Sequence, residues 1–564
     1  MKKKSTNIFI AQSVEELDYI YKKLKNTQNL ICVPVNLSTH LYCAQNKIPY
    51  YNLKNFISNK FHKEALISSK RMTNKIRFNK NLKLSEKTEI KSFLRFYFNS
   101  IVFLIEIVEQ IKKSTKINKI YVSGWFYYED TYSKKNYYIS FLLKELFKKK
   151  VIELSKNQSF SHLPSFQYKY DIISKKISNK KKIILFSNFG YNFFRILKYY
   201  LYQSNKFTLL APIDLKLSYF KRAVFRIFKI NFFSFKKIKK THYKYKFKLP
   251  SIFFRFRNKY NLTKLLNFRI KQEKSNLIKK SNQFNSILKF LSKKNVSLII
   301  ANNSRGLDGQ FLDYAHDKNI PSICVPHGTL SAYYNKFDRI YKNIISESVT
   351  YPKSTITSQS KISNMFFKKE KNLNNVISTG NIIFSQKSLL KNYNNKILYA
   401  VTSKDFHNIQ YLGVEMYYEF LENLSLLNNM AKTNRLDITV KCHPSIESSS
   451  QKLSKNYSNL HFTSKSIQKA LNETNLTISF SSTVIEDSLY SHSPVILFDR
   501  WKRYQHCHAE LNTKLKNRSV YYINSEKNLL KCIKTIFNSK NINFNSHIIP
   551  GKYNNNIKKL FKII

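Results

Sequence analysis

Short apolar runs alternate with helix-like segments along the chain, and this alternation predicts an α/β fold. In the N-terminal part, strand-like runs at Asn7–Ala11 and Leu30–Val35 enclose a helical pattern at Val14–Leu24. Further short apolar runs follow at Lys119–Val122 and Lys182–Phe186. Strands that alternate with helices in this way are typical of βαβ units and therefore of parallel sheets.

The pattern becomes sharper beyond Ser297, where strand-like runs fall into two groups. The first group consists of Ser297–Ala301, Pro321–Val325, Thr355–Ser358 and Val376–Ser378. The second group consists of Ile397–Val401, Asp437–Cys442, Leu476–Phe480 and Val495–Phe498. An Asn/Lys-rich run between them, at Lys391–Lys396, has the composition of a linker.

We therefore expect two Rossmann-like domains with parallel sheets that face each other across a cleft. The N-terminal domain is predicted to cover residues 1–390 and the C-terminal domain residues 391–545. A basic tail, residues 546–564, is expected to cross back to the first domain. The hydrophobic fraction of 43% in 564 residues is ample for packed cores of this size.

Composition adds one unusual feature, which is the charge balance. The chain has 98 Lys and Arg against 33 Asp and Glu, a formal net charge of +65. Such an excess fits nucleic-acid binding, attraction to anionic lipid, or a bias toward Lys, Asn and Ile codons. Charge bears on association and not on the fold, so it leaves these three interpretations open.

An insert at about residues 215–272 has no acidic residue, and its aromatic side chains are interleaved with Lys and Arg. It is either a basic helix or hairpin on a solvated face, or an interfacial segment that places aromatics and cations at lipid headgroups. Single-stranded nucleic acid would also suit stacked aromatics in a basic groove. We favour the anionic membrane surface as the partner and expect no nucleic acid.

The expected location is the cytoplasm, peripheral on the inner face of the cell membrane. No long uncharged apolar stretch is present that would span a bilayer. The six cysteines are scattered without CxxC spacing, so neither a zinc site nor a redox motif is indicated, and we expect reduced thiols.

Polar residues directly follow several strands of the second group, and ligands bind at the carboxyl ends of parallel strands. Lys404, His443 and the cluster Ser481, Ser482 and Thr483 all have this placement. Each has a structural explanation by itself, such as a helix cap for the hydroxyls or a satisfied strand-end histidine. Together they predict a donor site, in which the backbone N–H groups of the cluster and His443 meet a phosphate.

Three further residues are candidates for this chemistry. Glu486 lies one helical turn after Ser482, where its carboxylate would accept hydrogen bonds from ribose hydroxyls. His327 precedes a glycine after a strand of the first domain and is a candidate general base. Asp308 competes with His327 for that role.

Several familiar signatures are absent, including GxxxxGK[ST], GxGxxG and HExxH. No DxD pair offers a metal-chelating carboxylate motif. We therefore expect a metal-independent reaction that uses no cofactor, with the leaving phosphate stabilised by Lys, His and N–H groups.

Five motifs in a fixed order carry a resemblance to a known group of enzymes. They are the sequences at His327–Thr329 (HGT), Thr379–Asn381 (TGN), Ile397–Thr402, Lys441–Pro444 (KCHP) and Ser481–Asp487 (SSTVIED). This set resembles the CDP-glycerol glycerophosphotransferases and equally the polysialyltransferase-like and Kdo-transferase-like enzymes of bacterial capsule synthesis.

The resemblance implies the GT-B architecture, with the acceptor side first and the nucleotide side second. By this analogy His443 and the serines hold the donor, Gly380 of the TGN motif belongs with them, and His327 lies near the acceptor. Two departures stand out. Ile382 follows Asn381 where many relatives have proline, and the acidic-acidic-glycine motif is half present at Leu307–Gly309.

The predicted function is transfer of a sugar or polyol phosphate from a CMP- or CDP-activated donor to a cell-surface glycan or lipid-linked acceptor. One alternative is a nucleotide-sugar epimerase of the same architecture, which would act without an acceptor. The other is a non-catalytic basic scaffold that binds a membrane surface or nucleic acid. A non-catalytic scaffold would not require polar residues at the ends of the strands.

Overall fold

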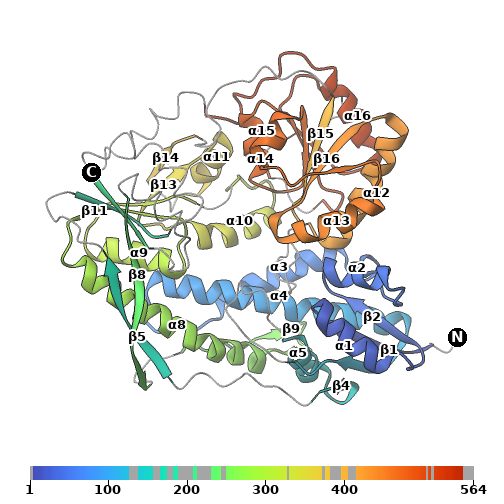
Figure 1. The fold of residues 1–564 in the computed structure, drawn as a ribbon, viewed down its shortest axis with the longest axis horizontal. Helices are drawn as coiled ribbons and strands as arrows, with labels where there is room; N and C mark the ends of the chain where they lie inside the picture. The colour runs from blue at the N-terminus through green and yellow to red at the C-terminus, as the bar shows by residue number, and fades with distance from the viewer. Residues whose placement is uncertain are drawn as a thin grey trace.

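The computed structural model describes residues 4–125, 138–155, 166–174, 182–188, 207–212, 230–242, 249–326, 330–370, 375–380, 395–403, 415–502, 506–507, 509 and 514–549. Within these ranges the chain forms sheets of four, eight and six strands and a two-stranded hairpin, and helices cover the sheets (Figure 1). The predicted class, α/β with two Rossmann-like regions of parallel strands, is confirmed.

The first sheet is small and parallel, with the strand order β2-β1-β3-β4. Its strands are β1 (Ser5–Ala11), β2 (Leu30–Pro34), β3 (Lys116–Val122) and β4 (Val151–Glu153). The helices that accompany it are α1 (Val14–Leu24), α2 (Leu37–Gln45), α3 (Asn59–Asn74), α4 (Leu84–Ser114) and α5 (Ile139–Phe147), with single 3-10 turns at Leu53–Asn55 and Lys148–Lys150. Side chains at the N-caps start α1, α2 and α3, because Ser13, Asn36 and Ser58 each accept a backbone N–H of the first turn.

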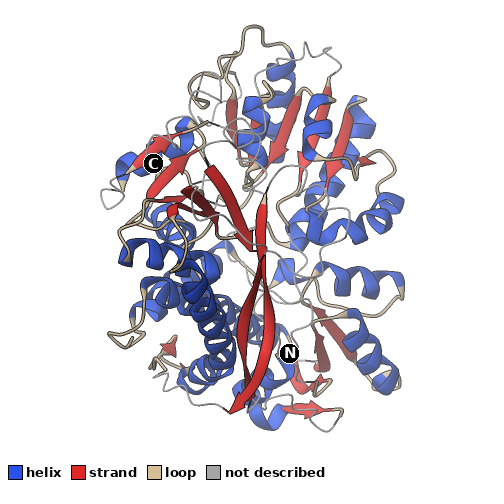
Figure 2. Cartoon of the chain, turned by 60° about the vertical axis from the view of Figure 1, so that its left-hand side comes forward, coloured by secondary structure: helices blue, strands red, loops and turns tan. Residues whose placement is uncertain are grey.

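The central sheet has eight strands in the order β14-β13-β12-β11-β6-β7-β8-β5. Its strands are β5 (Phe166–Ser174), β6 (Lys182–Phe186), β7 (Phe207–Pro212), β8 (Asn231–His242), β11 (Val296–Ala301), β12 (Ser322–Cys324), β13 (Thr355–Ser358) and β14 (Val376–Ser378). All neighbours are parallel except β5, which runs antiparallel to β8 at the edge and forms with it the long twisted ribbon of Figure 2.

Among the described residues, four helices and a hairpin belong to this part of the chain. They are α8 (Thr263–Leu291), α9 (Gly306–Asp317), α10 (Lys336–Val349), α11 (Lys361–Lys369), and the hairpin of β9 (Arg255–Phe256) and β10 (Tyr260–Asn261). The predicted N-terminal domain therefore contains two separate sheets. The described residues of the basic insert include β8, the hairpin and the start of α8.

The C-terminal sheet is parallel throughout, with the order β17-β16-β15-β18-β19-β20. Its strands are β15 (Lys396–Ala400), β16 (Asp437–Lys441), β17 (His461–Phe462), β18 (Leu476–Ser479), β19 (Val495–Phe498) and β20 (Val520–Ile523). Its helices are α12 (Tyr417–Asn434), α13 (Glu447–Asn456), α14 (Ile467–Asn472), α15 (Val484–Tyr490) and α16 (Glu526–Phe537), with a 3-10 turn at Pro444–Ile446.

One apolar core joins the first sheet to the C-terminal sheet. Its buried members include Ile8 of β1, Leu94 and Phe103 of α4, and Ile397 and Tyr399 of β15. The central sheet has cores of its own, which contain Ile183 and Phe311 among others. A hydrogen bond also joins the first sheet to the C-terminal unit: the Tyr417 hydroxyl donates to the Pro34 carbonyl at 3.0 Å.

Helix α4 is buried along most of its length because it lies between the other elements (Figure 1). Among the described residues, no helix combines the length and the apolar composition that crossing a bilayer requires. All six cysteines are buried and unpaired.

The described start of the C-terminal tail crosses to α11. The backbone N–H of Lys361 donates to the His547 carbonyl at 2.9 Å, and the Lys361 Nζ donates to the Asn545 carbonyl at 2.6 Å. The N–H of Ile549 donates to the Tyr490 hydroxyl of α15 at 3.1 Å. This segment therefore connects the central sheet's helix α11 to the C-terminal unit.

Candidate functional site

The order of strands in the C-terminal sheet creates a crevice at its centre. The first strand of this unit along the chain, β15, lies beside the fourth, β18, and the chain proceeds from them toward opposite edges. In an open parallel sheet, the loops at such a switch point diverge and leave a ligand site at the carboxyl ends of the strands. The central sheet has the same arrangement at β6 and β11.

A pocket of about 750 Å³ lies at the carboxyl ends of the C-terminal strands. The residues of the sheet unit that line it are Ala400–Thr402 after β15, Lys441–Pro444 after β16, Ser464–Ile467 after β17, and Ser481–Val484 after β18, together with Glu447, Asp487 and His506. The opposite wall is formed by Leu66 and Ser69 of α3, Ser92, Arg95, Phe96 and Asn99 of α4, and Tyr341, Lys342, Ile344, Ile345 and Ser348 of α10, with Arg305 and Ser331. The pocket is thus a cleft between the C-terminal unit and helices that precede it in the chain.

His443 lies between β16 and a 3-10 turn, and hydrogen bonds within that turn fix its ring. The backbone N–H of Ser445 donates to His443 Nδ1 at 3.1 Å, and the Ser445 hydroxyl lies 2.8 Å from the same nitrogen. Because Nδ1 accepts a backbone N–H, the neutral imidazole carries its proton on Nε2. His443 is therefore prepared to act as a hydrogen-bond donor through Nε2.

The serine cluster joins two strand ends. The N–H of Ser481 donates to the Thr402 Oγ1 at 3.3 Å, so the loops after β18 and β15 are tied together. The Ser482 hydroxyl accepts the N–H of Val484 at 3.2 Å, and Thr483 precedes the first residue of α15. The structure thus brings His443, Ser481, Ser482 and Thr483 to one pocket.

Glu486 lies elsewhere. Its carboxylate accepts hydrogen bonds from the hydroxyls of Ser360, the N-cap of α11, and Ser363 within α11, and it is not among the residues that line the pocket. The neighbouring Asp487 lines the pocket instead. Because Ser482 lies outside α15, helical spacing does not extend from Ser482 to Glu486.

A buried carboxylate behind the pocket fixes the loop after β15. Glu415 accepts the backbone N–H groups of Thr402 and Ser403 at 3.1 and 3.3 Å, and it also accepts from Asn423 Nδ2 at 2.8 Å. The Tyr399 hydroxyl donates to the same carboxylate. Sequence reasoning missed Glu415, because it lies beyond the strand end and acts through the backbone of the loop.

Besides the half-buried Arg305, two buried cations line the opposite wall. Arg95 of α4 pairs through Nη2 with Glu347 at 2.6 Å, while its Nε has no hydrogen-bond partner among the described residues. Lys342 of α10 is 3% exposed, and its Nζ donates to the Ala332 carbonyl. Burial lowers the pKa of Lys342 to about 8, against the opposing effect of Asp338. These two buried cations, although each lies near a carboxylate (Glu347 for Arg95 and Asp338 for Lys342), suit an anionic ligand.

His506 adds a neutral ring to this pocket. Burial lowers its pKa to about 3, with a further lowering from Lys342. Its Nε2 has no hydrogen-bond partner among the described residues. Arg95, Lys342 and His506 were not predicted from the sequence, although an arginine within the apolar run of α4 was a visible signal.

The two predicted catalytic residues have different outcomes. Asp308 lies at the switch point of the central sheet, where it accepts from the Ser187 hydroxyl, from Asn188 Nδ2 at 2.8 Å and from Asn303 Nδ2 at 3.0 Å. Burial raises the pKa of its carboxyl group. Asp308 does not line the pocket, but Arg305 in the loop before it does. His327 lies outside the described residues.

The remaining two predicted donor-binding residues are Lys404 and Gly380. Lys404 is outside the described residues. Gly380 follows β14 with a φ of +73°, a left-handed backbone conformation that glycine adopts without strain. It is buried and does not line the pocket. Within the described part of the chain, no group of three or more His, Cys, Asp or Glu residues could hold a metal ion.

Comparison with known proteins gives likeness to solved structures only. No protein-family model matches the chain, and no curated protein matches it in sequence. One similar structure is the Methanocaldococcus jannaschii UDP-GlcNAc 2-epimerase in complex with UDP-GlcNAc and UDP (13% identity, 68% of this chain and 99% of that chain, TM-score 0.38). Others are the UDP-N-acetylglucosamine 2-epimerase from Rickettsia bellii (11%, 68% and 95%, 0.37) and a glycosyltransferase from Rickettsia africae (13%, 65% and 92%, 0.36). At these values the function of this chain has to be inferred from its own pocket.

Proposed function

We propose that the protein is a GT-B transferase that binds a nucleotide-activated sugar or polyol donor in the pocket between the C-terminal unit and α3, α4 and α10. The observation that carries the proposal is the position of this pocket at the switch point of a parallel sheet. His443 and Ser481–Thr483 line the pocket there, opposite Arg95 and Lys342. In sheets of this order, nucleotides bind at that crevice.

The donor's phosphates are bound by groups from both walls. The Nε2–H of His443 donates to a phosphate oxygen, and the hydroxyls of Ser482 and Thr483 donate to others. Arg95 and Lys342 supply positive charge from the opposite wall. Asp487 accepts from ribose hydroxyls in place of Glu486.

The same charges favour departure of the nucleotide. An acceptor hydroxyl attacks the activated carbon of the sugar, or the phosphorus of a polyol donor, and the bond to the nucleotide phosphate breaks. The negative charge that develops on the leaving phosphate is stabilised by donors and cations already in place. A base takes the proton of the acceptor hydroxyl. The sequence candidates are His327 and Asp308, of which Asp308 does not itself line the pocket.

The proposed donor carries CMP or CDP, and the proposed acceptor is a cell-surface glycan such as a capsule chain. The proposed location is the inner face of the cell membrane, which the net charge of +65 supports. These choices follow from the resemblance of the motifs and from the charge, and each is open to test.

The test is a thermal-shift screen of the full chain with CMP, CDP, UDP and GDP. A nucleotide that binds only the native state raises the midpoint of unfolding. We expect a shift with at least one of the four that is lost in His443→Ala. Absence of any shift would overturn the proposal. Incubation with the sugar nucleotide then separates transfer from epimerisation, because an epimerase changes the sugar without any acceptor.

A further inference from the structure

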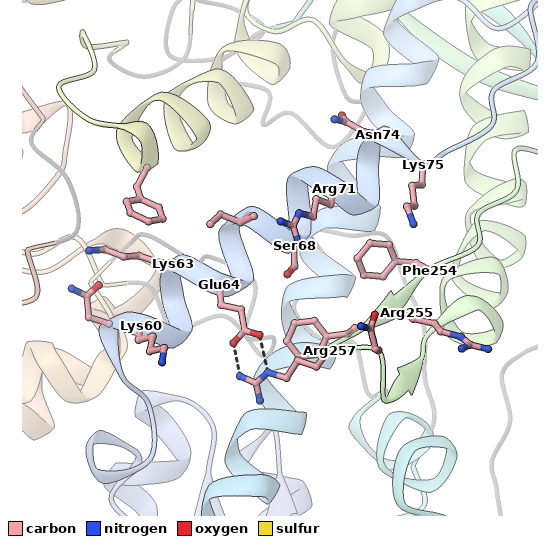
Figure 3. A pocket seen from close by; sticks show the side chains of 15 residues that line it. Lys60, Lys63, Glu64, Ser68, Arg71, Asn74, Lys75, Phe254, Arg255 and Arg257 are labelled. Atoms are coloured by element: carbon pink, nitrogen blue, oxygen red, sulfur yellow. Dashed lines mark hydrogen bonds and ion pairs between the residues drawn. The ribbon is translucent and has the colours of Figure 1, made fainter.

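A second groove lies outside the nucleotide pocket, between α3 and the β9–β10 hairpin. Its volume is about 1080 Å³, which exceeds the usual range of small-molecule pockets. Figure 3 shows Lys60, Lys63 and Arg71 along α3, with Arg255 and Arg257 on the hairpin across from them. A groove of this size accommodates an extended ligand rather than a single small one.

The groove is more basic than the chain as a whole. Six of the 15 residues that line it are Lys or Arg, against 98 in 564 for the complete sequence. Among the described residues that line it, Glu64 is the single acidic one. The lining is therefore richer in Lys and Arg than the chain average.

Within the described part of the chain, most of these cations have no carboxylate partner. Arg257 is the exception, because its Nε donates to Glu64 at 2.8 Å and its Nη2 lies 2.7 Å from the buried Glu106. For Lys60, Arg71 and Arg255, the described residues provide no ion pair. The charges of the groove therefore remain available to an external anion.

The Arg257 pairs have a different role, which is to hold the hairpin in place. Arg257 and Asn258 both have left-handed backbone angles, with φ of +48° and +52°, at the turn between β9 and β10. The two ion pairs fix this turn against α3 and α4. The wall that carries Arg255 is thereby held opposite α3.

Aromatic rings complete the groove. The Nζ of Lys63 lies 4.8 Å from the centre of the Phe337 ring at the start of α10, and that of Lys75 lies 5.8 Å from the Phe254 ring. Such contacts orient the ammonium groups without neutralising them. The lining thus combines fixed positive charge with apolar ring surface, which suits a chain of sugar rings that bears anionic groups.

The groove and the nucleotide pocket share the helix pair α3 and α10. Helix α3 presents Lys63 and Arg71 to the groove but Leu66 and Ser69 to the pocket. Helix α10 contributes Phe337 to the groove and Lys342 to the pocket. A ligand in the groove therefore lies next to the first-domain wall of the proposed transfer site.

We propose that this groove is the acceptor subsite and that it binds an extended anionic glycan whose sugars carry carboxylate or phosphate groups. The proposal rests on the proposed function, since it gives the groove's occupant the role of acceptor. A flat lipid surface is less suited, because a concave groove with opposed cationic walls surrounds a single chain.

The test compares two variants of the full-length protein with the same change in charge. In the groove variant, Lys60, Arg71, Lys75 and Arg255 are replaced by glutamine. In the control variant, Lys432, Lys455, Lys527 and Lys531, which are exposed on α12, α13 and α16, are replaced by glutamine. Binding of fluorescent polysialic acid, poly(glycerol phosphate) and neutral dextran is measured by anisotropy at constant ionic strength.

We expect the groove variant to lose roughly tenfold or more in affinity for at least one anionic glycan, as the sum of several exposed charge contacts. The affinity of the control variant should stay within about twofold of the unaltered protein, because exposed charges far from the ligand contribute little. Neutral dextran should not bind. The polymer that loses most identifies carboxylate or phosphate as the recognised group.

Three results would overturn the acceptor subsite. These are equal losses in the two variants, tighter binding of a single-stranded oligonucleotide than of either glycan, and loss of binding to anionic vesicles while glycan binding is unchanged. The nucleotide thermal shift, measured on the same samples, should persist in the groove variant. If that shift is absent in the unaltered protein as well, the proposed function fails independently of the groove.

Discussion

Replacement of His443 is the sharpest test of the nucleotide pocket, because the ring is positioned by one identified contact. The Ser445 N–H holds Nδ1, which directs the proton to Nε2 and makes the ring a donor. A hydrogen bond to a charged phosphate is worth about 1.5–3 kcal/mol. His443→Ala should therefore weaken nucleotide binding by roughly ten- to 150-fold.

The same substitution also removes a cap, and this effect must be separated from binding. Without the imidazole, the Ser445 N–H loses its acceptor, at a cost of about 1 kcal/mol in the free energy of unfolding. His443→Asn supplies the control, because an asparagine oxygen restores the cap but is too short to replace Nε2. We expect near-normal stability in this variant together with the full loss of affinity.

Calorimetric titration of the nucleotide found in the screen gives the affinity, and thermal unfolding without ligand gives the stability. Unchanged affinity in both variants, with the fold intact, would refute the reasoning, because it would mean that Nε2 does not contact the donor. Recovery of affinity in His443→Asn would show that the loss came from the turn and not from the ring.

Three other predictions concern charge, packing and catalysis. Burial lowers the pKa of Lys342 from 10.5 to about 8 in the folded protein. Below pH 8 the buried charge therefore lowers the free energy of unfolding, and this loss disappears as the pH rises from 8 toward 10.5, because the folded protein releases the proton first. Urea unfolding at the two ends of this range should show a gain of up to about 3 kcal/mol that Lys342→Met lacks, and an identical pH dependence in the variant would contradict the assignment. Glu486→Ala should lower the free energy of unfolding by about 1–3 kcal/mol, because the Ser360 hydroxyl loses its buried acceptor. Nucleotide affinity, measured by the same titration, should change little, whereas a large loss at normal stability would return Glu486 to the donor site. The general base is tested with His327→Ala and Asp308→Asn. The variant that removes the base should lose about 10²–10⁴-fold in turnover at saturating substrates. Near-normal turnover in both variants would exclude both residues as the base.

The strands of the second half were predictable from the sequence with good precision. Thr355–Ser358 and Val495–Phe498 coincide with β13 and β19, and Asp437–Cys442 exceeds β16 by one residue. These are short β-branched or apolar runs bounded by polar residues, for which local pattern and tertiary burial agree. The grouping of His443 with Ser481–Thr483 was predictable for the same reason, since strand ends share one edge of a sheet.

What could not be predicted depends on contacts between distant segments. Nothing local shows that Lys119–Val122 pairs in a separate sheet with β1 while Lys182–Phe186 pairs with β11. Likewise, Arg95 and Lys342 reach the pocket only because α4 and α10 pack beneath the C-terminal unit. The orientation of Glu486 was misjudged because the helix begins at Val484, after the serine that was used to set its face.

The shared core of the first and C-terminal sheets restricts how the nucleotide pocket can open. Apolar side chains of α3, α4 and β15 belong to one buried cluster, whereas Ile345 and Val349 of α10 pack in a core of the central sheet. Separation of α4 from the C-terminal unit would expose that cluster to water, so these two walls behave as one rigid body. Displacement of α10 alone would break the Arg95–Glu347 ion pair but would leave this cluster buried, because no residue of α10 belongs to it. In hydrogen-exchange experiments, amides of α4 and β15 should therefore exchange as one cooperative unit, and those of α10 should exchange through a separate opening.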